Sequence, residues 1–133
     1  MILGIGIDSI EINRFRDWHV KPYSSLARIF THSEIEYCLM TPRESAERFA
    51  VRFAAREGLF KAINKLFKQR VPFLTLCKHI SIQHDTHRAP YVQVDWKKLE
   101  YYLPTIDPHS LTIHMSITHT RTIATAFIIM EQQ

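Results

Sequence analysis

The longest regular pattern of apolar and polar positions runs from Thr41 to Lys68 and predicts one long helix. Thr41 is placed as an N-cap, Pro42 suits the first helical turn, and Glu44 completes a capping box. At a period of 3.6 residues, one face of this segment is an apolar stripe formed by Phe49, Phe53, Phe60, Ile63 and Phe67. We therefore expect this helix to be the central element of the fold.

Glu57 and Lys61 lie four residues apart beside that stripe, on a line that Ala50 and Ala54 continue toward the start of the helix. The small residues on this line predict that another segment approaches the helix closely beside a carboxylate. On helix statistics alone, such a pair is usually solvent-exposed and contributes about 0.3–0.5 kcal/mol to helix stability. The role of the Glu57–Lys61 pair therefore depends on which other segment of the chain packs beside it.

A strand is predicted over residues 2–7, where Gly4 and Gly6 share one face with Asp8. Two glycines on one face predict a close approach by another backbone or by a ligand. Asp8 is expected at the end of the strand, where it or Ser9 is placed to cap a following helix. Capping is the simpler interpretation of this carboxylate, and ligand binding is the alternative.

The rest of the chain predicts short helices and further strands. In the first C-terminal strand, His114, Ser116 and Thr118 share one face. The predicted elements are a helix from Ser25, a capping-box helix from Thr31 to Met40, a hairpin within residues 79–95, a short helix from Trp96 to Pro104, and two C-terminal strands joined near Arg121. Strands at both ends with helices between them predict an α+β fold and a single domain over residues 1–133.

Composition narrows the class of protein. An apolar content of 46% and a charged content of 23% are ordinary for a globular domain. Cys38 and Cys77 match no metal or disulfide spacing, and the N-terminus has no basic region before its apolar run, so we expect a cytoplasmic protein without a signal peptide or membrane span. The net charge of +4 suits an anionic partner, but no run of basic residues marks a nucleic-acid-binding arm.

Three segments carry a family resemblance. M-I-L-G-I-G-I-D-S-I-E-I at residues 1–12, R-F-A-A-R-E-G-L-F-K-A at 52–62 and H-M-S-I-T-H-T at 114–120 occur in this order. Their order and spacing resemble those of the holo-acyl-carrier-protein synthases, the small phosphopantetheinyl transferases of fatty-acid synthesis. The resemblance extends over residues 1 to 131 and is weakest between 63 and 110. Each motif alone is weak, but the three together are specific.

The resemblance implies a reaction, a cofactor and an assembly. It implies that 4′-phosphopantetheine moves from coenzyme A to a serine of apo acyl carrier protein, and that adenosine 3′,5′-bisphosphate leaves. It also implies a small antiparallel sheet packed on the long helix, in a homotrimer with active sites between subunits. Transfer at a pyrophosphate requires the charge on the phosphate oxygens to be balanced. Mg²⁺ suits this task because it binds one or two protein carboxylates together with substrate phosphates.

The same resemblance assigns the site residues. Asp8 and Glu57 match the metal carboxylates, and Lys61 matches the lysine beside the phosphates, so Glu57 and Lys61 are the expected catalytic residues. The resemblance leaves three candidates for the general base, which are Lys61, Glu57 and a metal-bound water. Arg52 and His114 match family positions in the nucleotide cleft. The other expected coenzyme A contacts are Arg56, Lys61 and the hydroxyls of Ser116 and Thr118. The expected carrier-protein contacts are Arg14, Arg16, Lys21 and Arg28, for which a solvated basic surface is the alternative.

The chain departs from the family pattern at three places. Arg56 and Gly58 stand where the family has lysine and alanine, and glycine inside a helix costs about 0.8–1 kcal/mol relative to alanine. The Gly-Thr-Gly loop after the lysine is replaced by Asn64-Lys65-Leu66, and the Gly-Lys-Pro turn by Arg88-Ala89-Pro90. These changes put coenzyme A affinity in question more than metal binding.

Two alternatives to a Mg²⁺-dependent transferase therefore remain. One is a non-catalytic trimeric protein with the same fold that binds coenzyme A or a carrier protein. Metal-dependent turnover would distinguish the enzyme from this binding protein. The other is a small basic nucleic-acid-binding domain, which predicts steeply salt-dependent binding. This second alternative leaves Asp8, Glu57 and the segment at residues 114–120 unexplained.

Overall fold

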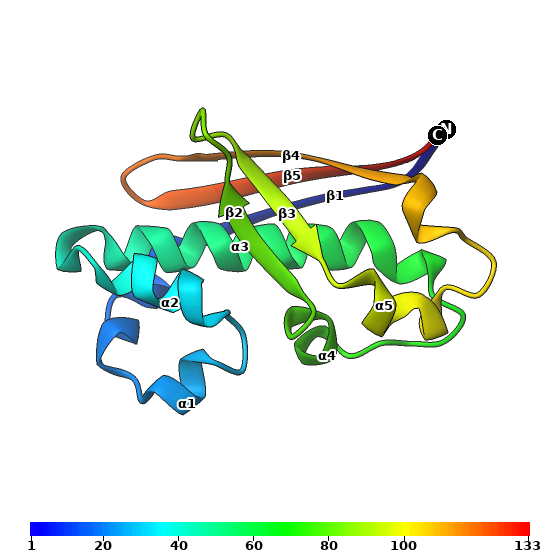
Figure 1. Ribbon diagram of the computed structural model, residues 1–133. Helices are drawn as coiled ribbons and strands as arrows, with labels where there is room; N and C mark the ends of the chain where they lie inside the picture. Colours follow the sequence, from blue (N-terminus) through cyan, green and yellow to red (C-terminus); the bar gives the residue numbers. More distant parts are fainter.

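The computed structural model describes all residues from 1 to 133 and confirms the predicted α+β architecture (Figure 1). A three-stranded antiparallel sheet in the order β1-β5-β4 packs on the long helix α3 (Ser45–Ile63). The strands are β1 (Ile2–Glu11), β2 (Ile80–His84), β3 (Pro90–Val94), β4 (Leu111–His119) and β5 (Ile123–Gln132). The hairpin β2–β3 crosses α3, and the two chain ends lie together at one end of the sheet (Figure 1).

Short helical elements surround α3. The α-helices are α1 (Tyr23–Leu26), α2 (His32–Leu39), α4 (Phe73–Cys77) and α5 (Trp96–Leu99). The 3₁₀ turns are η1 (Ile12–Phe15), η2 (Trp18–Val20), η3 (Pro42–Glu44), η4 (Asn64–Leu66), η5 (Glu100–Tyr102) and η6 (Pro108–Ser110). None of the helices is long and apolar enough to cross a membrane.

β1 packs directly on the backbone of α3. A Cβ atom at Gly6 would overlap the carbonyl oxygen of Gly58, and a Cβ atom at Gly4 would overlap that of Ala62. No larger residue fits at either position without moving the strand, so the close approach predicted from these glycines is confirmed. Asp8 follows on the same face of β1, and the contact brings this carboxylate to the helix.

Two predicted boundaries are wrong. Thr41 makes no side-chain cap, because Pro42–Glu44 form a 3₁₀ turn and α3 begins only at Ser45. The helix ends at Ile63, since the chain turns through η4 and the amide of Lys68 donates to the carbonyl of Tyr102 at 2.9 Å.

β1 is also longer than predicted. Pairing with β5 continues to Glu11, which lies opposite Ile123, so Asp8 lies inside the strand opposite Ala126 and caps no helix. The continuous ladder of backbone hydrogen bonds overrides the local capping signal of Asp8 and Ser9.

Other predicted elements are confirmed. Thr31 and Glu34 form the capping box of α2, in which the Thr31 amide donates to Glu34 Oε1 at 3.1 Å. The hairpin and the two C-terminal strands also form where the alternation predicted them. Two apolar clusters, one centred on Phe49 and one on Leu59, pack against opposite ends of α3 and fix its position beneath the sheet.

Candidate functional site

Three of the predicted site residues meet at the β1 edge of α3. The ammonium of Lys61 lies 3.1 Å from Asp8 Oδ1 and donates to the carbonyl oxygen of Ile7 at 2.9 Å. Glu57 lies one helical turn before Lys61 on the same flank of the helix. The glycine contacts between β1 and α3 place these groups, so the site depends on backbone packing as well as on its side chains.

The two carboxylates act on each other electrostatically. Partial burial and the nearby Asp8 carboxylate raise the pKa of Glu57 above its ordinary value, although Lys61 and Arg14 oppose the rise. Burial is the larger cause of the raised pKa, and the repulsion from Asp8 adds to it.

This carboxylate pair suits a hard divalent cation. Asp8 and Glu57 offer oxygen donors, which Mg²⁺ prefers, and a cation between them would relieve the repulsion that raises the pKa of Glu57. The chain holds no group of three or more His, Cys, Asp or Glu side chains placed to bind a metal ion. Two carboxylates without a third ligand are typical of sites where substrate phosphates complete the coordination of Mg²⁺.

A second polar site lies on the opposite flank of α3, at the edge strand β4. It is a hollow of about 300 Å³, and the predicted residues Arg52 and Thr118 both line it. Arg48 and Arg52 stack on the ring of Tyr37, with guanidinium carbons 4.0 Å and 4.5 Å from the ring centroid. Arg48 also donates to Glu44, another residue of the lining, at 2.6 Å, so the guanidinium of Arg52 is the better placed of the two to bind a phosphate or a nucleotide.

Arg52 lines this hollow but is otherwise buried, and one of its nitrogen donors forms no hydrogen bond. Its Nη1 donates to the carbonyl of Arg48 at 3.2 Å, but its Nε has no hydrogen-bond partner. The nearest carboxylate oxygen to that Nε, Glu34 Oε2, is 4.0 Å away. A buried donor without a partner is costly, so the chain does not fully satisfy the hydrogen-bonding groups of Arg52.

Sequence reasoning missed the other eight residues that line this hollow, two of which are glutamates. Arg48 is one helical turn before Arg52, and this spacing is the signal that would have found it. Tyr37, His84 and His119 come from three other elements, and no local pattern connects them to Arg52. Burial and the charge of Arg52 lower the pKa of His84, so this imidazole is neutral near pH 7 and free to accept or donate a hydrogen bond.

Arg56 does not reach either site, contrary to the expected contact with coenzyme A. It is fully buried and forms a bidentate ion pair with Glu34 of α2, at 2.7 Å from Nη1 to Oε2 and 2.5 Å from Nη2 to Oε1. Its Nη2 also donates to the carbonyl of Ile80 in β2 at 3.0 Å. Arg56 therefore joins α2, α3 and β2, because helical periodicity turns it away from the flank that Glu57 occupies.

His114 and Ser116 also lie apart from Arg52 within the chain. Both are exposed on the outer face of β4, and His114 Nε2 lies 2.9 Å from Glu131 Oε2. Four residues of strand, about 13 Å, separate His114 from Thr118 at the hollow. Of the three polar positions predicted on one face of this strand, only Thr118 therefore lines the same hollow as Arg52.

The two sites are separated within one chain. Arg52 and Glu57 are five residues apart, which turns their side chains by about 140° around the helix axis. Asp8 belongs to β1 and Thr118 to β4, which are the two edge strands of the sheet. One copy of the chain therefore presents the carboxylate site and the arginine-lined hollow on opposite flanks.

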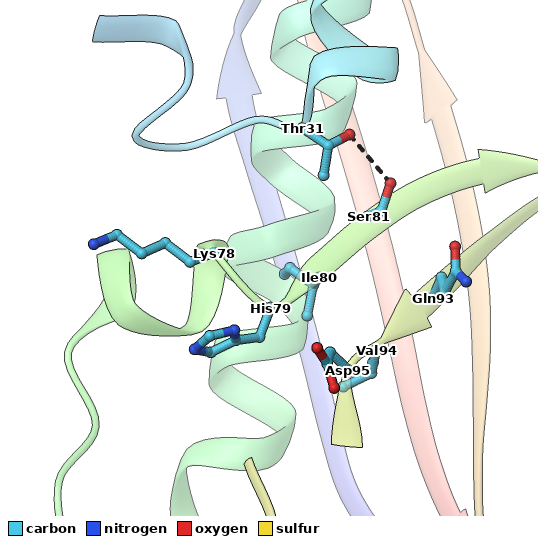
Figure 2. A pocket seen from close by; sticks show the side chains of 8 residues that line it. All are labelled: Thr31, Lys78, His79, Ile80, Ser81, Gln93, Val94 and Asp95. Carbon is cyan, nitrogen blue, oxygen red and sulfur yellow. Dashed lines mark hydrogen bonds between the residues drawn. The ribbon is translucent and has the colours of Figure 1, made fainter. Parts of the chain in front are cut away.

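The predicted basic residues Arg14, Arg16, Lys21 and Arg28 are all exposed on the segment between β1 and α2. Another hollow, of about 420 Å³, lies where β2 and β3 pass the start of α2, next to the Thr31–Ser81 hydrogen bond (Figure 2). None of the predicted site residues lines it, so we exclude it from the candidate site.

The chain is similar to known proteins of one family. The 4′-phosphopantetheinyl transferase superfamily matches residues 4–126. The holo-(acyl-carrier-protein) synthase of Treponema denticola is 33% identical over 98% of this chain and 99% of its own length. That of Zymomonas mobilis is 34% identical over 98% of this chain and 97% of its own length.

Solved structures show the same fold. The holo-(acyl-carrier-protein) synthase of Bacillus anthracis, in complex with coenzyme A, superposes with a TM-score of 0.73 at 26% identity, over 100% of this chain and 99% of that one. The acyl carrier protein synthase of Mycobacterium tuberculosis superposes with a TM-score of 0.70 at 28% identity, over the whole of both chains. The resemblance found in the motifs is confirmed, and this chain belongs to the 4′-phosphopantetheinyl transferase superfamily.

Proposed function

We propose that this chain transfers the 4′-phosphopantetheine of coenzyme A to a serine hydroxyl of apo acyl carrier protein. The serine oxygen forms a bond to the phosphorus nearer the pantetheine, the bond from that phosphorus to the bridging oxygen breaks, and adenosine 3′,5′-bisphosphate leaves. The observation that carries this proposal is the meeting of Asp8, Glu57 and Lys61 at one edge of the sheet.

Each residue of the carboxylate site has a role in this reaction. Asp8 and Glu57 would hold Mg²⁺, which supplies positive charge to the diphosphate oxygens when it is bound. Lys61 is held by Asp8 and by the carbonyl of Ile7, and its remaining donor capacity is available to a phosphate oxygen. The serine proton has three candidate acceptors in this arrangement, which are Lys61, Glu57 and a metal-bound water.

The arginine-lined hollow is the proposed site for the nucleotide end of coenzyme A. The guanidinium of Arg52 offers donors to a phosphate, and His84 offers a ring surface to the adenine. His114 and Ser116 join this site only if the outer face of the sheet takes part in it.

The separation of the two sites supports a homotrimer. A single copy cannot offer both sites to one ligand, because they lie on opposite flanks of α3. A ring of three copies repeats one contact between unlike faces, so that each carboxylate site meets the hollow of the next copy. The exposed apolar residues on the outer sheet face support such a contact, with Ile5 55%, Ile7 56% and Phe127 39% exposed.

The cellular setting follows from the chemistry of the chain. Cys38 and Cys77 are both free and buried, which suits a reducing compartment, so we place the protein in the cytoplasm. Coenzyme A and acyl carrier protein are the proposed partners, with Mg²⁺ as the only cofactor.

Mass spectrometry of apo acyl carrier protein tests the proposal. The carrier is incubated with this protein, coenzyme A and Mg²⁺, and a parallel sample contains EDTA. We expect a phosphopantetheine adduct that requires the metal. Coenzyme A binding without an adduct would favour the non-catalytic alternative, and an adduct that persists with EDTA would overturn the metal assignment.

A further inference from the structure

The arginine-lined hollow contains two carboxylates as well as its cations. Glu44 comes from the turn η3 just before α3, and Glu47 comes from the first turn of α3. Arg48 Nη2 donates to Glu44 Oε2 at 2.6 Å. Glu47 Oε1 lies 3.1 Å from Nε2 of His119, at the end of β4. The two glutamates equal the two arginines of the lining in number, so their charges cancel in a hollow proposed for an anionic ligand.

Arg48 is held in place by contacts that do not involve Glu44. Its Nη1 donates to the carbonyl oxygen of Tyr37 at 2.8 Å, and its guanidinium carbon lies 4.0 Å from the centroid of the Tyr37 ring. These contacts use one terminal nitrogen and the flat face of the guanidinium, and they leave Nη2 to Glu44 alone. Removal of the Glu44 carboxylate should therefore free one donor without moving the arginine.

The Glu44 carboxylate, in contrast, is held only by Arg48. Its oxygens form no other hydrogen bond or ion pair, and its side chain is 52% exposed, against 17% for Arg48. A pair of this kind, four residues apart on a helix face and open to water, contributes little to stability. A phosphate oxygen forms an equally strong charge-assisted hydrogen bond, so it can replace this carboxylate while Glu44 turns out into water.

The donor that Glu44 occupies lies beside the second guanidinium of the hollow. The guanidinium carbons of Arg48 and Arg52 lie 4.0 Å and 4.5 Å from the centroid of the same Tyr37 ring. With Glu44 bound to Arg48, the hollow offers the guanidinium of Arg52 to a phosphate. With Glu44 displaced, it offers two adjacent guanidiniums, and the carboxylate that repels the ligand has moved away.

We propose that Glu44 is an internal competitor of the nucleotide's phosphate. Its carboxylate occupies Arg48 in the free chain, and the ligand displaces it in order to bind both arginines. This inference rests on the proposed function, because it takes the hollow as the nucleotide site. It makes Glu44 a residue that lowers the affinity for coenzyme A and favours the release of adenosine 3′,5′-bisphosphate after transfer.

Calorimetric titration of the full-length protein at low salt tests the proposal. The ligands are coenzyme A and, separately, adenosine 3′,5′-bisphosphate, which has the nucleotide without the pantetheine. Glu44→Gln keeps the shape of the side chain and removes its charge, so we expect it to lower both Kd values about fivefold. The control is Glu100→Gln in η5, which follows α5 near the other end of α3, and it should change them less than about twofold (Figure 1).

A double-mutant cycle separates the release of Arg48 from simple loss of repulsion. In an Arg48→Met chain, Glu44→Gln should change either Kd less than about twofold, because no guanidinium remains to be freed. An equal gain with and without Arg48 would mean that Glu44 acts only by repelling the ligand, which would overturn the proposal.

The outcomes also separate this proposal from the proposed function. Transfer by the wild-type protein with an unchanged or higher Kd for Glu44→Gln would overturn the competitor and leave the function standing. A lower Kd for Glu44→Gln without transfer by the wild type would do the reverse. Binding of coenzyme A by neither protein would overturn both. Circular dichroism of each variant excludes misfolding as the cause of any change.

Discussion

The two flanks of α3 are built in different ways. On the β1 flank, Asp8 and Glu57 are brought together by backbone contact, because Gly4 and Gly6 leave no room between strand and helix. On the β4 flank, Arg52 is held by side chains, with Tyr37 stacked on it and the Glu34 carboxylate nearby. The carboxylate site therefore depends on main-chain packing, and the arginine-lined hollow depends on a buried polar network.

This difference predicts which substitutions damage which half. A change in the strand–helix contact should disturb metal binding, whereas a change in the buried network should disturb coenzyme A binding. A substitution that affects both halves equally would remove the distinction.

The largest expected effect is that of Glu57→Gln. Loss of one metal carboxylate should lower kcat about 10²–10³-fold, as measured by the rate of carrier modification at saturating coenzyme A. Stability should not fall at pH 7. Because the pKa of Glu57 is raised in the folded chain, its ionised form is less favourable there than in the unfolded chain, and its removal costs nothing.

Glu36→Gln is the control for that change, since Glu36 is an exposed carboxylate on α2. It should leave kcat within about twofold of the wild type. If Glu57→Gln keeps the wild-type rate while circular dichroism shows an intact fold, the carboxylate site is not the catalytic centre.

The next effect is that of Glu34→Ala on the other flank. This change leaves Arg56 fully buried without its partner, which should lower the free energy of unfolding by about 3–5 kcal/mol. It also removes the carboxylate nearest to Arg52, so the KM for coenzyme A should rise while the affinity for Mn²⁺, used as a probe of the metal site, stays the same. Urea unfolding and a Mn²⁺ titration measure the two quantities.

Glu36→Ala on the same helix serves as the matched variant and should change the free energy of unfolding by no more than about 0.5 kcal/mol. A fall in Mn²⁺ affinity with Glu34→Ala would show that the two flanks of α3 are coupled and do not depend on separate sets of contacts.

A third prediction tests whether the flanks of neighbouring copies complete one site. Glu57→Gln and Arg52→Ala chains, each inactive alone, are coexpressed with different tags, and mixed oligomers are purified through both tags. In any mixed ring of three, one contact joins an intact carboxylate site to an intact hollow, so about a third of the wild-type activity should return. If both halves of the site came from one copy, every copy would carry a defect and no activity would return.

The sequence was sufficient for the residues whose signals are local. The capping box at Thr31, the alternation of the strands and the two glycines of β1 each describe their own neighbourhood, and all three predictions were correct. Glu57 and Lys61 share a helix flank by simple periodicity, so their association also needed no structure.

The errors have non-local causes. Asp8 looked like a helix cap because its pairing with Ala126 of β5 depends on a strand more than a hundred residues away. Arg56 looked like a ligand contact because the partner that buries it, Glu34, lies on another helix. The hollow at Arg52 draws on five elements, and no sequence pattern placed Tyr37 or His84 beside it.

The smallest expected effect is that of Gly58→Ala, which restores the residue usual in the family at the centre of the β1 flank. Alanine is favoured over glycine inside a helix by about 0.8–1 kcal/mol, but the new Cβ would lie 3.2 Å from Cγ1 of the fully buried Ile128. Moving that side chain by a few tenths of an ångström costs about 1 kcal/mol, so the two effects should offset, and the urea midpoint should barely change. Gly6→Ala, whose Cβ would overlap the carbonyl of Gly58 across the same contact, should instead unfold the protein or abolish Mn²⁺ binding. A tolerated Gly6→Ala variant with unchanged Mn²⁺ affinity would mean that backbone packing does not set the carboxylate site, and the two flanks would then differ only in their side chains.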